Sequence, residues 1–403
     1  MTLNRMGRAA VASIFSLAMG LGLTACGNDY TVAYLYATTA KANPGLITGY
    51  KIDYLTGTLS TLADSPVPSG GKNPVTLVAS PNSKFIYVVH RDDSSVVEFA
   101  IGTDGKIYSQ KTYNVTGSFP TAAAIDPSGK FLYVTFTYQN GPQGQLYTPA
   151  NPGPGGVTIF PINSDNSLGA PSTVNLGRAP VGITASSKNH FVYVIAQDSE
   201  TTLNLFGFSA DPTTGFLTAL PGVTINPGNV PSTGYPSGVT PSAISEDPAS
   251  SHLYITDSTQ NQVVGYSIAA NGVPTQMTNG AAPTDAAPVG MTIDITGKYL
   301  YVVNYTGGTI AGYTFGSNGQ PIRSTVAGSV QAGTGPTCVT TIGAPNNTDP
   351  KQGIYMYTSN QLSNSITGEQ VFPQDGSLKQ IYNTPFSASA LPTCLVSVPA
   401  LNF

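Results

Sequence analysis

Short apolar segments alternate with polar segments along almost the whole chain, and one phrase recurs. A proline leads an apolar segment, a short polar turn follows, and a second apolar segment is centred on tyrosine. Apolar segments of this length between turn residues predict β-strands. The leading prolines are Pro74, Pro120, Pro180, Pro241, Pro288, Pro336 and Pro392. In the six complete copies the tyrosines are Tyr87, Tyr133, Tyr193, Tyr254, Tyr301 and Tyr357.

Each copy continues into a further strand and a tight turn. Residues 263–268 are one such strand, and Asp104–Gly105 and Asn318–Gly319 are two of the turns. Asp-Gly and Asn-Gly supply the positive φ angles that a hairpin turn requires. The unit is therefore a four-stranded meander, and its repeat length matches one blade of a β-propeller.

The seventh copy accounts for both ends of the repeat. Pro392 begins a strand with no partner strands after it, whereas residues 32–38 form a strand that lacks an inner strand before it. A blade shared by the two ends removes the open edge that a sheet must otherwise protect. We predict an all-β, seven-bladed propeller of four-stranded blades over 32–403, closed by this shared blade.

The N-terminus has the pattern of a secretory signal. Arg5 and Arg8 precede an apolar stretch over 9–23, which is too short to span about 30 Å of hydrocarbon. The following residues, 23–26, match the lipobox of bacterial lipoproteins, in which small residues precede an acylated cysteine. We predict a signal peptide over 1–25, a lipid on Cys26 that serves as the membrane anchor, and a tether over 26–31. The alternative is an ordinary cleaved signal with a chance cysteine.

This pattern predicts an exported protein that is lipid-anchored to the cell envelope. In a Gram-negative source we expect the outer membrane in preference to the inner, because Gly27 and not Asp follows the cysteine.

Charge is scarce. The 16 basic and 20 acidic residues make up 9% of the 403, against about 25% in an average soluble domain. A net charge of −4 without basic clusters argues against nucleic-acid binding, which depends on Lys and Arg. No metal-ligand spacing or phosphate-binding glycine loop stands out, so we expect no metal and no cofactor.

One phrase carries a family resemblance. The chain has no Trp, unlike WD-repeat propellers, and it contains Tyr301-Val-Val-Asn304 and a related phrase over 126–135. These phrases resemble the lactonase and YVTN-repeat family of seven-bladed propellers, which is 6-phosphogluconolactonase-like. The resemblance implies lactone chemistry by His, Arg and acidic residues at the top of a central channel.

Opening a lactone needs a general base and a group that stabilises the oxyanion. The topology places the ends of second strands and the starts of inner strands on one face, which we name the top face. Five residues there are candidate catalytic groups: His90, Arg91, Arg178, Glu200 and Asp257. The alternative is that they are ordinary loop charges. The long loops over 137–156 and 226–240 lie on the same face.

The leading prolines are not followed by the histidine seen in lactonases of this family, and the chain has only three His. We therefore predict a binding or scaffold module that uses the top-face loops for a protein or glycan partner. The alternative function is hydrolysis of an unphosphorylated sugar-type lactone. In that case His90 or an acidic residue is the base, and Arg91 or Arg178 stabilises the oxyanion.

Cys338 and Cys394 occupy the same position in two adjacent inner strands, two residues after the proline. A disulfide here fits an oxidising compartment. The opposing consideration is that neighbouring inner strands splay apart, and Cα atoms more than about 7 Å apart cannot be bridged. The sequence leaves both outcomes open.

Overall fold

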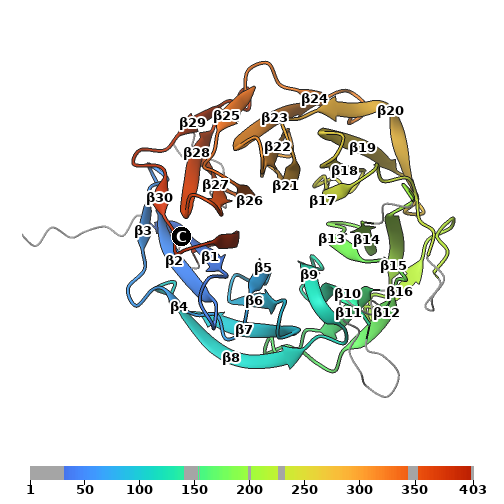
Figure 1. Ribbon diagram of the computed structural model, residues 1–403, viewed down its shortest axis with the longest axis horizontal. Coiled ribbons are helices and arrows are strands. Elements are labelled where there is room, and N and C mark those ends of the chain that lie inside the picture. The colour runs from blue at the N-terminus through green and yellow to red at the C-terminus, as the bar shows by residue number, and fades with distance from the viewer. Residues whose placement is uncertain are drawn as a thin grey trace, which may run out of the picture. The chain divides into compact units, whose positions relative to one another are not determined.

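The computed structural model describes residues 31–139, 153, 155–197, 201–225, 232–343 and 353–400. Strands in these residues form seven sheets, and no helix occurs among them. Consequently, none of the described segments is a helix able to cross a membrane. Figure 1 shows the sheets arranged in a ring, each with one edge strand nearest the centre. The prediction of a seven-bladed propeller is confirmed.

Blades 1 to 4 each run outward in chain order. Blade 1 contains β5 (Pro74–Ala79), β6 (Phe85–His90), β7 (Ser95–Ile101) and β8 (Ile107–Asn114). Blade 2 contains β9 (Ser118–Ile125), β10 (Phe131–Tyr138), β11 (Gly156–Pro161) and β12 (Ser172–Asn175). Blade 3 contains β13 (Pro180–Ala185), β14 (Phe191–Ala196), β15 (Leu205–Ala210) and β16 (Leu217–Ala219). Blade 4 contains β17 (Pro241–Glu246), β18 (His252–Asp257), β19 (Gln262–Ile268) and β20 (Pro274–Pro283).

Blades 5 to 7 each add a short strand that pairs with the third strand of the blade. Blade 5 contains β21 (Pro288–Ile293), β22 (Tyr299–Asn304), β23 (Thr309–Phe315), β24 (Pro321–Arg323) and β25 (Ser329–Gln331). Blade 6 contains β26 (Pro336–Ile342), β27 (Ile354–Asn360), β28 (Ser365–Val371), β29 (Leu378–Gln380) and β30 (Phe386–Ser387). Blade 7 contains β31 (Pro392–Pro399), β1 (Thr31–Thr39), β2 (Leu46–Asp53), β3 (Leu59–Thr61) and β4 (Val67–Pro68).

Blade 7 joins the two ends of the repeat, as predicted. Its inner strand, β31, pairs antiparallel with β1, and β1 pairs in turn with β2. All nine residues of β1 are buried, because neighbouring strands and blades cover it on both faces. A strand covered in this way has no place for a charged side chain in contact with water, which is why so few residues of the chain are charged.

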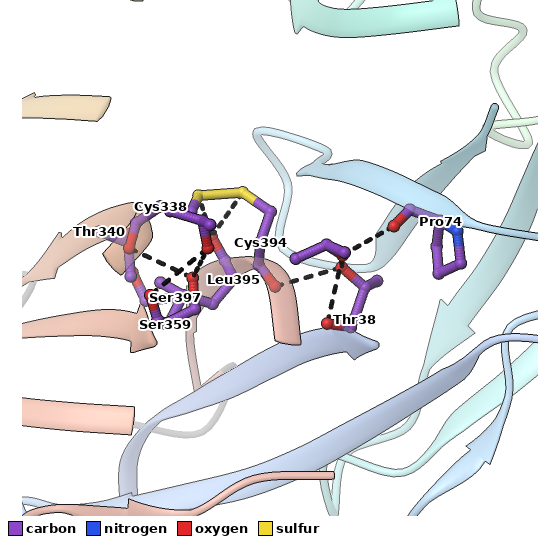
Figure 2. Close-up of a disulfide and its surroundings, with 10 residues drawn as sticks. Thr38, Pro74, Cys338, Thr340, Ser359, Cys394, Leu395 and Ser397 are labelled. Atoms are coloured by element: carbon purple, nitrogen blue, oxygen red, sulfur yellow. Dashed lines mark hydrogen bonds between the residues drawn. A yellow bond between two sulfur atoms is a disulfide. The ribbon is translucent and has the colours of Figure 1, made fainter. Parts of the chain in front are cut away.

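Two kinds of contact hold blade 7 to its neighbours. On one side Cys338 of β26 and Cys394 of β31 form a disulfide (Figure 2), with Cα atoms 4.9 Å apart. The two inner strands therefore approach within bridging distance at this position. On the other side the Thr393 hydroxyl donates a hydrogen bond to the Pro74 carbonyl of blade 1, at 2.7 Å.

The recurring tyrosine connects each blade to the next. In six blades its buried hydroxyl donates to the carbonyl of a turn residue in the following blade, at 2.6 to 2.8 Å. The pairs are Tyr36–Gly105, Tyr87–Asn166, Tyr193–Gly272, Tyr254–Gly319, Tyr301–Gly376 and Tyr357–Gly57.

The turn residue also needs space. Gly105 has a φ of +80°, and a Cβ there would lie 2.2 Å from the ring of Tyr34. At this junction the sequence therefore needs both the tyrosine and a glycine in the turn to join the two blades.

Candidate functional site: the top face of the ring

One residue of each second strand pairs with the leading proline of the inner strand. We name these the strand-end residues, and all seven are at most 1% exposed. They are Thr39, His90, Phe136, Ala196, Asp257, Asn304 and Asn360. Two of the candidate catalytic residues, His90 and Asp257, are therefore buried inside the wall of the ring.

Polar strand-end residues fasten the loop that leads into their own blade. Asn304 Oδ1 accepts a hydrogen bond from the Thr284 hydroxyl at 2.8 Å, and Asn360 Oδ1 accepts one from the Gly333 amide at 3.0 Å. These loops directly precede the leading prolines of blades 5 and 6. The Asn of the Tyr-Val-x-Asn phrase thus has a structural role here.

His90 has the same role in blade 1. Its Nε2 lies 2.9 Å from the Ser69 hydroxyl, which itself donates to the Gly71 carbonyl. This contact holds the ring against the loop that leads into blade 1. The ring also packs closely under Gly71, where a Cβ would lie 2.6 Å away. Burial lowers the pKa of His90 to about 4, so the imidazole stays neutral.

Asp257 is equally committed. Its Oδ2 accepts a hydrogen bond from the Val239 amide at 2.6 Å, and its Oδ1 accepts from the amides of Thr259 and Gln260, each at 3.0 Å. These amides belong to the two top-face loops beside the strand end. The carboxylate holds both loops in place through three of its roughly four acceptor positions.

The residues that directly follow the strand-end residues are at least partly exposed on this face, and we name them the rim residues. They are Ala40, Arg91, Thr137, Gln197, Ser258, Tyr305 and Gln361. In six blades the rim amide donates to the carbonyl of the residue before the leading proline, at 2.8 to 3.1 Å. In blade 2 the Thr137 hydroxyl donates to that carbonyl at 3.0 Å. The backbone of the rim is therefore fixed while its side chains remain at least partly exposed.

Aromatic rings and a guanidinium meet at blades 1 and 2. The Arg91 guanidinium lies over the Phe119 ring, 5.5 Å from its centroid. The Tyr138 ring meets Phe119 edge-on, with centroids 5.6 Å apart. Arg91 is exposed, whereas the two rings are half-buried, so this cluster presents a cation and aromatic surface together.

Uncharged polar groups occupy other parts of the rim. Gln197 donates a hydrogen bond through Nε2 to the Pro241 carbonyl of the next blade, at 3.0 Å. The Tyr305 hydroxyl donates to Gln361 Oε1 at 3.2 Å, again between neighbouring blades. Each of these side chains is oriented by one hydrogen bond to the neighbouring blade, and its other lone pairs and N–H groups stay available to a ligand.

Of the two remaining candidates, the structure describes Arg178, which stands one residue before Ala179, the acceptor of the Gln197 amide. Arg178 donates through Nε to the Ser232 carbonyl at 3.0 Å, which ties it to the backbone near β15 and β16. Glu200 and most of the loop over 137–156 lie outside the described residues. No cluster of His, Cys, Asp and Glu suited to a metal ion is found where the chain is described.

Sequence reasoning missed Phe119, Tyr305 and Gln361, because it searched the top face for charged side chains. A signal for Tyr305 and Gln361 was present in the repeat itself. Each rim residue stands one position after the Asn of the Tyr-Val-x-Asn phrase or its equivalent, so alignment of the repeats locates the whole set.

Among curated proteins, a 6-phosphogluconolactonase from Photorhabdus laumondii is 35% identical to this chain over 85 residues, which are 21% of this chain. The match spans only a quarter of the length of that relative.

Among solved structures, the periplasmic gluconolactonase of Pseudomonas aeruginosa superimposes with a TM-score of 0.70 at 16% identity, over 92% of this chain and all of that one. A 6-phosphogluconolactonase candidate from Bacteroides fragilis gives 0.70 at 19% identity, over 92% and 99%. At these identities the two structures show a shared fold.

The family described as lactonase, seven-bladed β-propeller, matches residues 45–141 and 231–340, just over half of the chain. The chain therefore belongs to the lactonase family of seven-bladed β-propellers.

Proposed function

We propose that this propeller binds a neutral, sugar-type ligand on its top face and does not transform it. The observation that carries the proposal is the division between strand-end and rim residues. His90 and Asp257, which a reaction would need for proton transfer, are buried and bonded to loops. The accessible rim presents amides, hydroxyls, the Tyr305 ring and the Arg91 guanidinium, and the rings of Phe119 and Tyr138 lie beside Arg91.

This set of groups matches the chemistry of a sugar. The C–H faces of a sugar ring are apolar and pack on aromatic rings such as Phe119 and Tyr138. Its hydroxyls donate to and accept from planar amides such as those of Gln197 and Gln361. Binding sites of this kind combine apolar contact with a few oriented polar groups. The same rim also fits the sugar of a glycan partner.

The proposal is tested by calorimetric titration of the full chain with a panel of neutral mono- and disaccharides. For a sugar that binds, Arg91→Ala and Tyr305→Phe should each weaken affinity about five- to tenfold, the usual cost of one polar contact. Tyr382→Phe is the matched control, because Tyr382 is 78% exposed and lies beyond the rim. Equal affinity in all variants, or no binding at all, would contradict the proposal.

Hydrolysis of an unphosphorylated lactone is the second candidate function, and family membership is the observation that favours it. In this reading Arg91 or Arg178 stabilises the oxyanion and Glu200 is the base. Turnover of D-glucono-1,5-lactone, measured by alkali consumption, should then vanish in Arg91→Ala and Glu200→Gln. Turnover that never exceeds the spontaneous rate excludes this lactone as a substrate.

We also propose that the protein is exported and lipid-anchored through Cys26, which would present the propeller outside the cytoplasm. The apolar stretch and the residues before Cys26 support this proposal. Metabolic labelling with radioactive palmitate should mark the wild type and not Cys26→Ser. Retention of label by the variant would refute acylation at this cysteine.

A further inference from the structure

Two exposed leucines stand on the top face where blades 6 and 7 meet. Leu362 is 55% exposed and directly follows the rim residue Gln361. Leu391 is 37% exposed and directly precedes the leading proline of blade 7. A single exposed leucine is ordinary on a protein surface, whereas adjacent ones rimmed by polar groups mark a binding site.

Contacts place Leu362 beside the polar groups of the rim. A Cβ added at Gly335 would lie 2.8 Å from Leu362 Cγ and 3.2 Å from Tyr305 Cε2, so both side chains cover Gly335. The Tyr305 hydroxyl in turn donates to Gln361 Oε1 at 3.2 Å. A tyrosine hydroxyl, a carboxamide and an aliphatic side chain therefore stand together over Gly335.

A second contact brings Leu391 to the same place. Its amide donates a hydrogen bond to Asn364 Oδ1 at 2.8 Å. This bond holds Leu391 against the turn over 361–364, which carries Leu362. We name this surface the blade 6–7 patch, and its residues are Tyr305, Gln361, Leu362 and Leu391.

The repeat shows that Leu362 departs from the other blades. The residue one position after the rim residue is polar in five blades, where it is Lys41, Asp92, Asp198, Thr259 or Thr306. The exceptions are Leu362 and Tyr138, and Tyr138 belongs to the aromatic cluster at blades 1 and 2. The turn itself therefore does not require an apolar side chain at this position.

Leu391 retains its side chain against a conformational cost. Its φ is +55°, in the left-handed region that disfavours bulky residues. Asn73 and Gly335 precede the leading prolines of blades 1 and 6 with φ of +52° and +65°, and both residue types tolerate this conformation. A half-exposed leucine gains little burial within the protein to offset the strain. Strained residues of this kind indicate a role in binding.

We propose that the top-face ligand is a glycoside with an apolar aglycone, whose sugar hydroxyls bond to Gln361 and Tyr305 and whose aglycone packs on Leu362 and Leu391. This inference rests on the sugar binding proposed above and adds the class of ligand. None of the four patch residues is charged, which suits an uncharged aglycone, because a charged group would lose hydration against the leucines.

Methyl and octyl β-D-glucopyranoside carry the same sugar and are the probes, titrated calorimetrically into the full chain with the octyl compound below its micelle concentration. The wild type should bind octyl glucoside about tenfold more tightly, because the alkyl chain leaves water on the leucines. Leu391→Asn and Leu362→Ser should each weaken octyl glucoside binding about three- to fivefold and leave methyl glucoside binding unchanged. Leu391→Asn should fold at least as well as the wild type, since Asn73 has the same conformation.

Leu55→Asn is the matched control, because Leu55 is 56% exposed on the turn between β2 and β3 of the opposite face. It should leave both affinities unchanged, whereas Tyr305→Phe should weaken both glucosides alike. If methyl glucoside binds and octyl glucoside binds no more tightly, this inference is overturned and the proposed sugar binding stands. Binding of 1-octanol as tight as that of octyl glucoside, or an equal loss in Leu55→Asn, would also overturn it. Absence of binding by either glucoside would count against both proposals.

Discussion

Glu369 stands where the other blades place an aromatic ring. Its counterparts in the pairing register are Tyr50, Phe99, Phe160, Phe208, Tyr266 and Tyr313. Glu369 is 1% exposed, lies opposite Met356, and neither carboxyl oxygen has a hydrogen-bond partner. Burial without compensation raises the pKa of Glu369 from 4.5 to about 8.

This shift makes the stability of the fold depend on pH. Below pH 4.5 the carboxyl is protonated in the native and unfolded states, and no penalty arises. Between pH 4.5 and about 8 the unfolded chain releases the proton while the native state keeps it, so stability falls by about 1.4 kcal/mol per pH unit. The total loss is about 5 kcal/mol and is complete near pH 8.

Glu369→Gln removes the titrating group and retains its shape. The free energy of unfolding of this variant should exceed that of the wild type by an amount that grows from pH 5 to pH 8 and approaches about 5 kcal/mol. Urea unfolding at each pH, monitored by circular dichroism, measures this difference in free energy of unfolding. Glu98→Gln is the control, because buried Glu98 accepts a hydrogen bond from Tyr113 at 2.7 Å and should show a smaller effect. If the free energy of unfolding varied with pH in the same way for the wild type and for Glu369→Gln, the reasoning would be refuted.

Two further predictions concern the contacts that hold the blades together. Tyr193→Phe leaves the Gly272 carbonyl without its partner and should lower the free energy of unfolding by about 1–2 kcal/mol. Tyr133→Phe should change this free energy little, because the Tyr133 hydroxyl has no partner to lose. Urea unfolding that ranks the two variants in the opposite order would contradict the assigned contacts. Replacing Cys338 and Cys394 together by Ser opens a loop that the disulfide closes across a sequence separation of 56 residues, and should lower the free energy of unfolding by about 4 kcal/mol. An unchanged unfolding midpoint would show that the disulfide contributes nothing to stability.

The fold was predictable because each blade repeats the same local signals. Each blade has a leading proline, a tyrosine such as Tyr87 and an Asp-Gly or similar turn, and each of these marks one part of the blade. The strands missing at the two ends of the repeat predict that one shared blade closes the ring. The actual approach of Cys338 to Cys394 was not predictable, because it depends on how far two inner strands splay.

The candidate site was predictable only in its location. His90 and Asp257 were placed correctly on the top face by topology. Their burial follows from loops that fold over the strand ends, and no local pattern reports that packing. Phe119 and Tyr305 were overlooked for the opposite reason, since uncharged residues in a loop give no chemical signal until the rim is assembled.

The central claim is that the rim residues form a binding surface. Hydrogen–deuterium exchange of the full chain, with and without a saturating sugar from the panel, locates the ligand directly. Slower exchange should appear in peptides over 91–94, 305–308 and 361–364, with no change in the opposite-face turns over 126–130 and 211–215. Protection confined to the opposite face, or none on the top face with a sugar that binds, would contradict the account.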